Sequence, residues 1–131
     1  MNASPSTMRT ALGKVRGYGS AKSGTEHFIR QRLTAIANIP LTIGAVLIVI
    51  SLIGHNHAAV AQILGSTLVS IVMLLFIIST FYHMKIGMQV VIEDYVHDER
   101  AKYALLILNT FFTIAAGFSS AYAILKLSFG V

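Results

Sequence analysis

Cysteine is absent from this sequence. The chain therefore cannot form a disulfide, and with its own residues it can hold neither an iron–sulfur cluster nor a thiolate zinc site. Any metal that this chain binds must use histidine as a ligand.

Charged residues are scarce. They make up 11% of the chain, against roughly 25% in ordinary soluble domains, whereas hydrophobic residues make up 55%. Most apolar residues lie in three predicted spans, at about 33–53, 58–88 and 103–125. Each reaches the ~20 residues that a helix needs to cross the bilayer, and three segments cannot close a barrel. The sequence therefore predicts an all-α membrane protein with three transmembrane helices.

The second span is predicted to be longer than the bilayer requires. Apolar residues continue past Tyr82 as far as Ile92, so one helix is expected from Ala58 to about Ile92. Such a helix must tilt or protrude from the membrane. A short turn, Gly54–His57, is expected before it.

Basic residues predict the orientation, because loops rich in Lys and Arg stay in the cytoplasm. Six of the ten precede the first span: Arg9, Lys14, Arg16, Lys22, Arg30 and Arg32. We expect a cytoplasmic amino terminus, with residues 1–25 as a basic arm and 26–131 as the membrane anchor domain. The carboxyl terminus is then periplasmic. The net charge of +5 is explained by this topology and by lipid head groups rather than by nucleic acid.

The arm has the composition of a transit peptide, since it is basic, polar and free of acidic residues. The start at Met1 instead favours an uncleaved chain in a bacterial inner (plasma) membrane. No internal repeat is present.

His83 is the candidate for chemistry within the spans. Ser79 and Gly87 lie four residues to either side, and such residues share a helix face with it. A flat macrocycle needs small neighbours beside its axial ligand. The alternative is a histidine that marks the membrane interface and bonds to water or a backbone carbonyl. The remaining histidines are expected to be solvated: His27, His55, His57 and His97.

Asp94 and Tyr95 follow His83 on the same predicted helix. Asp94 is eleven residues beyond His83, so it points nearly the same way about 16 Å further along the axis. The Tyr95 hydroxyl can donate a hydrogen bond to a carbonyl oxygen. The alternative is that Tyr95 is an interfacial anchor within a solvated charged loop.

The joint spacing of these residues resembles the hydrophobic membrane anchor subunit of succinate dehydrogenase (respiratory complex II). The matching pattern in residues 79–100 is His83, Ile86-Gly87-Met88, Gln89-Val90 and Asp94-Tyr95; upstream it is His27-Phe28-Ile29, Arg32 and Thr34-Ala35-Ile36. The likeness covers roughly residues 26–131. The arm before Thr25 has no counterpart, and span three matches only in hydrophobicity.

The resemblance implies a role in electron transfer from succinate to ubiquinone. His83 would be one axial ligand of a b-type haem whose second ligand is a histidine of a companion anchor subunit. Tyr95, with Asp94 nearby, would hydrogen-bond ubiquinone in a pocket shared with that companion and the iron–sulfur subunit. FAD and the iron–sulfur clusters would lie only in partner subunits, the flavoprotein and iron–sulfur subunits. The chain would then be a non-catalytic subunit of an enzyme complex.

Lys85 and Arg32 are the cations nearest this region. By charge, either can pair with haem propionates or lipid phosphates, although snorkelling to the interface explains both without a ligand. Other polar and small residues within the spans are expected to serve helix packing: Asn38, Pro40, Gln62 and Asn109, with Gly44, Gly65 and Gly117.

Two rival functions remain open at this point. One is a small transporter or channel subunit, but no charged residue lies in the middle of any span, where ion paths usually have them. The other is a purely structural membrane partner in which His83 binds nothing.

Overall fold

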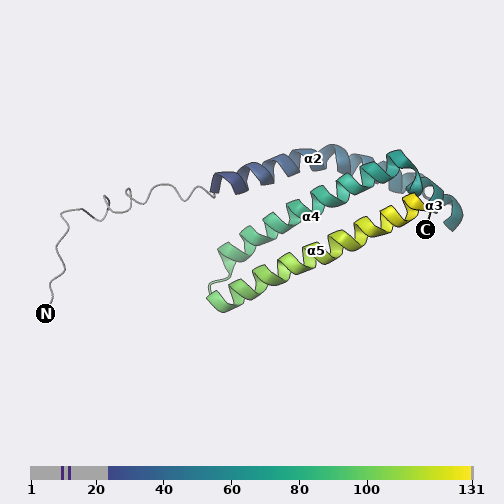
Figure 1. Cartoon of the computed structure of the whole chain (residues 1–131). Coiled ribbons are helices and arrows are strands. Elements are labelled where there is room, and N and C mark those ends of the chain that lie inside the picture. Colours follow the sequence, from purple (N-terminus) through teal and green to yellow (C-terminus); the bar gives the residue numbers. More distant parts are fainter. Residues whose placement is uncertain (1–9, 11, 13–23, 131) are drawn as a thin grey trace.

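The structure is a computed structural model that describes residues 10, 12 and 24–130. Most of the predicted basic arm, with Arg9, Lys14, Arg16 and Lys22, lies outside the described residues. The described part contains four helices and no strand: α2 (Gly24–Ser51), α3 (His57–Gly65), α4 (Thr67–Tyr95) and α5 (Glu99–Phe129) (Figure 1). The fold is all-α, as predicted.

Three of these helices, α2, α4 and α5, are long and apolar enough to cross a membrane. They have 28, 29 and 31 residues, and their most apolar windows have mean hydropathies of 2.3, 2.0 and 1.6. The predicted number of spans is therefore confirmed for the part of the chain that the structure describes.

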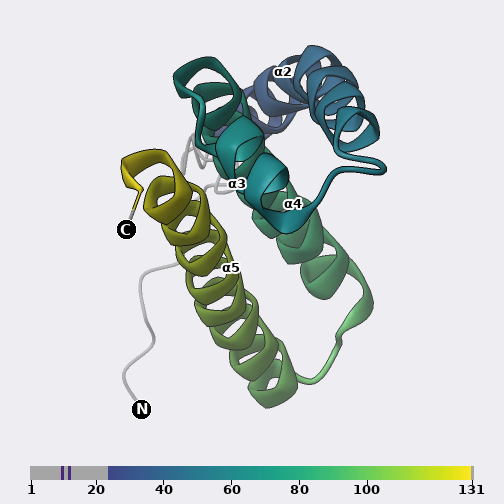
Figure 2. The ribbon, with the colours of Figure 1, turned by 90° about the vertical axis from the view of Figure 1, so that its right-hand side faces the viewer.

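Helix α4 lies in the middle of the molecule. It packs against α2 on one side and α5 on the other, whereas α2 and α5 make no close contact with each other (Figure 2). The chain runs back and forth, so the start of α2 lies at the same end as the α4–α5 loop. This arrangement places the residues of α4 in reach of both neighbouring helices.

Charge divides the molecule into two unlike ends. The end with the α4–α5 loop, called the charged end below, carries every charged residue of the described helices and loops except Lys126: Glu26, Arg30, Arg32, Lys85, Glu93, Asp94, Asp98, Glu99, Arg100 and Lys102. The opposite end holds α3 and the end of α5.

Helix ends follow local sequence signals. The Asn56 side chain caps α3 by accepting from the Ala59 N–H at 2.9 Å, and Asp98 caps α5 by accepting from Ala101 at 2.8 Å. Gly54 has a φ of +81° in the turn after α2, a backbone conformation that glycine adopts without a steric penalty.

The prediction of one helix from Ala58 to about Ile92 is wrong. The helix breaks at Ser66, where the backbone is extended, so residues before it form the separate helix α3. Ser66 bonds to the Ile63 carbonyl through its N–H at 3.2 Å and its hydroxyl at 2.8 Å. Ser70 Oγ donates to the Leu64 carbonyl at 2.8 Å. These bonds satisfy carbonyls that a continuous helix would pair with its own N–H groups.

Close packing places α3 against the end of α5. A Cβ on Gly65 would lie 2.6 Å from the Leu127 carbonyl oxygen, so only glycine fits at this contact. Gly44 and Gly117 would meet Val72 and Phe81 side chains at 3.4 and 3.5 Å. The expectation of close packing is confirmed for Gly65, whereas a Cβ at Gly44 or Gly117 would make only an ordinary van der Waals contact.

The described part of the bundle has very little core. Its buried residues are Ala45, Ile86, Ile92, Ile124, Ser70, Asn109 and Thr113. Large apolar side chains such as Phe111 and Phe118 stay exposed. Such a surface suits contact with lipid chains and with other membrane helices rather than with water.

Candidate functional site

His83 lies on α4 and faces α2. Its Nδ1 is 3.0 Å from the Thr34 hydroxyl, and its Nε2 is 3.4 Å from the Gln31 side-chain nitrogen. The imidazole is half-buried. The structure thus joins His83 to two polar residues that lie 49 and 52 positions earlier in the sequence.

The Thr34 hydroxyl is also tied to its own helix. Its oxygen lies 2.9 Å from the Arg30 carbonyl oxygen and 3.1 Å from the Gln31 carbonyl oxygen. Threonine often makes such a bond one turn back along a helix. The Thr34 hydroxyl that contacts His83 is therefore held in place by its bond to the α2 backbone.

Gly87 and Ser79, the small residues one turn to either side of His83, leave space beside α4. A Cβ on Gly87 would lie 3.4 Å from the Gln31 side-chain nitrogen, so Gly87 makes room for Gln31 beside the imidazole. Ser79 lines a groove of about 440 Å³ between α2 and α4, together with Thr34 and Tyr82. His83 is not among the residues that line this groove, so the predicted room for a macrocycle beside it stays a prediction.

Four buried polar atoms of α2 and α4 lack a partner, and one of them belongs to Gln31, which contacts His83. Among the described residues these atoms are Gln31 Oε1, Asn38 Oδ1, Ser79 Oγ and Thr80 Oγ1. All four belong to α2 or α4 and lie within four residues of Thr34 or His83. An unpaired polar atom is costly in an apolar medium. We call this group, with Thr34 and His83, the polar seam; it has hydrogen-bonding capacity left for another molecule.

The donor set fits a haem better than a bare metal ion. No group of three or more histidine and acidic side chains that could hold an ion occurs in the described part of the chain. A haem iron takes its equatorial nitrogens from the porphyrin and needs only axial ligands from protein. A single half-buried imidazole beside Gly87, in a seam with unpaired polar atoms, meets that requirement for one axial position.

Tyr95 and Asp94 lie in the last turn of α4, at the charged end. The Tyr95 side chain is 78% exposed, and Asp94 is also exposed. Twelve residues separate Tyr95 from His83 within the unbroken α4, which is about 18 Å along the axis. The structure does not bring this pair to His83, and it leaves both side chains open to a partner.

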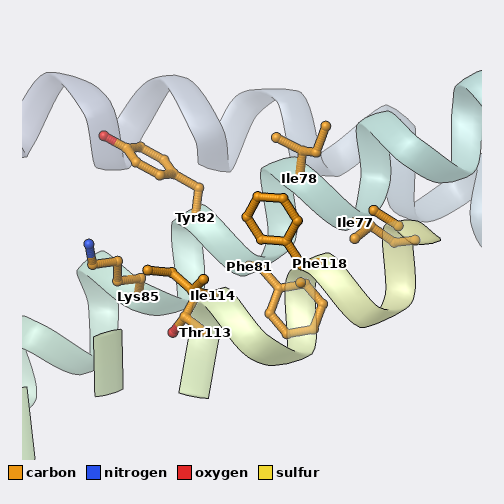
Figure 3. A pocket seen from close by; sticks show the side chains of 10 residues that line it. Ile77, Ile78, Phe81, Tyr82, Lys85, Thr113, Ile114 and Phe118 are labelled. Atoms are coloured by element: carbon orange, nitrogen blue, oxygen red, sulfur yellow. The ribbon is translucent and has the colours of Figure 1, made fainter. Parts of the chain in front are cut away.

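Lys85 and Arg32 are not joined to His83 either. Lys85 lines a groove of about 360 Å³ between α4 and α5, where its nitrogen and the Tyr82 hydroxyl lie at one end and apolar side chains at the other (Figure 3). The Arg32 guanidinium lies 4.9 Å from the centre of the Phe28 ring. Their proposed roles stay predictions.

The remaining histidines are exposed, as predicted: His27, His55, His57 and His97. The sequence reasoning missed Gln31 and Thr34 as neighbours of His83. A signal for them exists, because Gln31, Thr34 and Asn38 stand three and four residues apart on one face of α2.

Comparison with known proteins gives consistent results. The sequence profile of the family described as succinate dehydrogenase/fumarate reductase transmembrane subunit matches residues 6–117. The similarity therefore begins within the basic arm, and the prediction that the arm before Thr25 has no counterpart is wrong. A protein of Rickettsia bellii, named succinate dehydrogenase hydrophobic membrane anchor subunit, is 31% identical over 81% of this chain and 85% of its own length.

Proteins of the same name in Rickettsia conorii and Paracoccus denitrificans are 32% and 27% identical. They cover 81% and 88% of this chain, and 85% and 89% of their own lengths. No solved structure matches. The profile covers most of the chain, and three helices can span a membrane. The chain therefore belongs to the family of succinate dehydrogenase/fumarate reductase transmembrane subunits, as a multi-pass protein of the bacterial inner membrane.

Proposed function

We propose that this chain is the hydrophobic membrane anchor subunit of a succinate:ubiquinone oxidoreductase. It would join a companion anchor subunit, a flavoprotein subunit that carries the FAD, and a third subunit that carries the iron–sulfur clusters. The names of the Rickettsia and Paracoccus relatives support this role. The chain by itself is then not an enzyme, but it supplies part of two binding sites.

The first site is that of a b-type haem, with His83 as one axial ligand. The observation that carries this proposal is the polar seam, in which a single imidazole stands among unpaired polar atoms. A histidine of the companion anchor would supply the second ligand, as the family resemblance implies. The haem, when bound, supplies an iron that takes up and releases one electron. His83 would hold that iron from this chain's side of the site.

The second site is that of ubiquinone, with Tyr95 and Asp94. The exposed Tyr95 hydroxyl can donate a hydrogen bond to a quinone carbonyl, and the adjacent carboxylate of Asp94 can orient it or relay protons. Partner subunits would complete this pocket. Both residues lie at the charged end, which is the cytoplasmic face if the amino terminus is cytoplasmic.

Lys85 and Arg32, also at the charged end, would pair with the acidic groups of a bound molecule. Lys85 Nζ lies at the polar end of the groove between α4 and α5, and Arg32 is exposed near the start of α2. A haem propionate or a lipid phosphate offers either side chain a negative partner.

Absorption spectra of the complex assembled with its companion anchor test this function. The wild type should show a reduced-minus-oxidised b-haem spectrum, and His83→Ala should abolish or shift it. Tyr95→Phe should keep the spectrum but slow quinone reduction about 2- to 10-fold, the value of one hydrogen bond. His97→Ala, at an exposed histidine, is the matched control and should change neither. A normal haem spectrum in His83→Ala, or a colourless wild-type complex with normal quinone kinetics in Tyr95→Phe, would refute the assignment.

A further inference from the structure

The Thr34 hydroxyl has more acceptors around it than it has protons. Its oxygen lies 2.9 and 3.1 Å from the carbonyl oxygens of Arg30 and Gln31, and 3.0 Å from His83 Nδ1. A hydroxyl carries one hydrogen, and a carbonyl oxygen can only accept. The two carbonyl contacts therefore compete for that hydrogen, and a bond to either one leaves only the oxygen lone pairs for His83.

It follows that His83 is the donor in its contact with Thr34. Nδ1 carries the proton and donates to the hydroxyl oxygen, while the hydroxyl donates to the Arg30 carbonyl. A neutral imidazole has one protonated nitrogen, so Nε2 keeps its lone pair. The Gln31 contact agrees, because the amide nitrogen 3.4 Å from Nε2 is a donor and needs an acceptor opposite it.

We propose that Thr34 is a positioning residue that holds His83 in the tautomer protonated at Nδ1, with the Nε2 lone pair directed at the iron. This inference rests on the proposed role of His83 as a haem ligand. Histidines that bind metals generally donate their other ring N–H to an outer partner, which fixes the tautomer and the ring orientation. Here the outer partner is the Thr34 hydroxyl, which accepts from His83 Nδ1 and donates to the Arg30 carbonyl of α2.

Gln31 lies at the other ring nitrogen of His83. Its amide group covers Nε2, and Gly87 leaves the room for it. Its other amide atom, Oε1, is buried without a partner, so the side chain is weakly held. A ligand that approaches Nε2 displaces one long contact of 3.4 Å and leaves the bond between Thr34 and Nδ1 in place.

The opposite tautomer makes a different prediction. If the Thr34 hydroxyl donated to Nδ1, Nε2 would carry the proton and would face the Gln31 amide nitrogen, which is also a donor. The amide would have to be reversed for this arrangement to hold. The two tautomers are distinguished by which ring nitrogen is protonated.

Long-range proton–nitrogen correlation spectra measure this directly. The full chain, with ¹⁵N-labelled histidine, is placed in lipid nanodiscs without haem, and His83→Gln assigns the signal by its loss. We expect Nδ1 to be the protonated nitrogen in the wild type and in Thr34→Ser, which keeps the hydroxyl. Thr34→Val keeps the volume but removes the hydroxyl, so Nε2 should become protonated in a large share of molecules. Thr42→Val, at an exposed threonine two turns further along α2, should match the wild type.

A second measurement uses the assembled complex with haem. The rate of haem transfer to excess apomyoglobin should rise about 10- to 100-fold in Thr34→Val, the usual effect of losing an outer partner of a metal ligand. Thr34→Ser and Thr42→Val should stay near the wild-type rate. If Thr34→Val does not assemble with the companion anchor, the spectra of the chain alone in nanodiscs still test the proposal.

Either of two results would overturn the proposal: a wild-type ring protonated at Nε2, or a Thr34→Val ring that stays protonated at Nδ1. Neither result involves haem. Failure of the proposed function would appear separately, as a normal haem spectrum in His83→Ala.

Discussion

Asn109 links helices α4 and α5 through a side-chain hydrogen bond. Its side-chain nitrogen on α5 donates to the Lys85 carbonyl on α4 at 3.0 Å, and the residue is buried. Lys85 is two residues from His83, so this bond fixes α5 against the part of α4 that carries the imidazole. The expectation that Asn109 serves helix packing is confirmed.

Replacement of Asn109 by leucine should weaken the bundle modestly. Hydrogen bonds between membrane helices contribute about 0.6 kcal/mol on average and at most about 1.7 kcal/mol, so we expect a loss in that range. The measurement is the unfolding midpoint of the full chain in mixed micelles on titration with SDS. Ser120→Ala is the control, because the Ser120 hydroxyl bonds to Ala116 of its own helix. A loss as large in Ser120→Ala would show that Asn109 has no special role between helices.

At the scale of single residues, the sequence predicted what is local to one helix. His83, Ser79 and Gly87 follow from four-residue spacing alone. The contacts of His83 with Gln31 and Thr34 cross between helices, and the rotation of α2 against α4 decides them. Packing sets that rotation. The apolar residues of a lipid-facing helix do not reveal it, and the signal for it lies in the spacing of the polar residues Gln31, Thr34 and Asn38.

The short helix α3 is an element held by contacts at both of its ends. Asn56 caps its start, and its end approaches the backbone of α5 at Gly65 and Leu127. The approach is between main chains, so neither side can yield by turning a flexible side chain.

Gly65→Ala should therefore detach α3 from α5. The new Cβ would lie 2.6 Å from the Leu127 oxygen, and overpacking of this kind usually costs about 1–3 kcal/mol. Hydrogen–deuterium exchange of residues 57–65 should become faster than in the wild type. Gly24→Ala is the control, since nothing lies within 4 Å of its Cβ. Unchanged exchange in Gly65→Ala would mean that the contact is not maintained in the membrane.

The number and type of the long helices were predictable, because length and apolar content decide them. The break at Ser66 was not. The stretch from Ala58 to Ile92 contains no proline, and Ser66 and Thr67 are tolerated inside membrane helices. The break depends on hydrogen bonds from Ser66 and Ser70 and on the fit of Gly65 to a residue 62 positions away. Such distant contacts leave no periodic pattern in the sequence.

At the scale of the whole molecule, the division of charge predicts how the protein sits in the membrane. The charged end should face the cytoplasm, because basic residues near the spans are retained there. Lys126 is the lone charged residue of the described helices at the other end.

Single cysteines can test this orientation cleanly, since the native chain has none. His55→Cys lies in the turn between α2 and α3, and His97→Cys lies in the loop between α4 and α5; both positions are exposed. A membrane-impermeant maleimide added to spheroplasts that express the chain alone should label His55→Cys. It should label His97→Cys only after permeabilisation. The reverse pattern would show that the protein is inserted the other way around.

The unbroken course of α4 has a geometric consequence for the two proposed redox positions. Inserting one residue between His83 and Tyr95 would swing the phenol about 100° around the axis and push it only about 1.5 Å further. Seven inserted residues would nearly restore the azimuth, yet they would add about 10 Å to the separation of the two side chains. Direction and separation cannot both be preserved by any single insertion, so the length of this segment is as constrained as the two side chains at its ends.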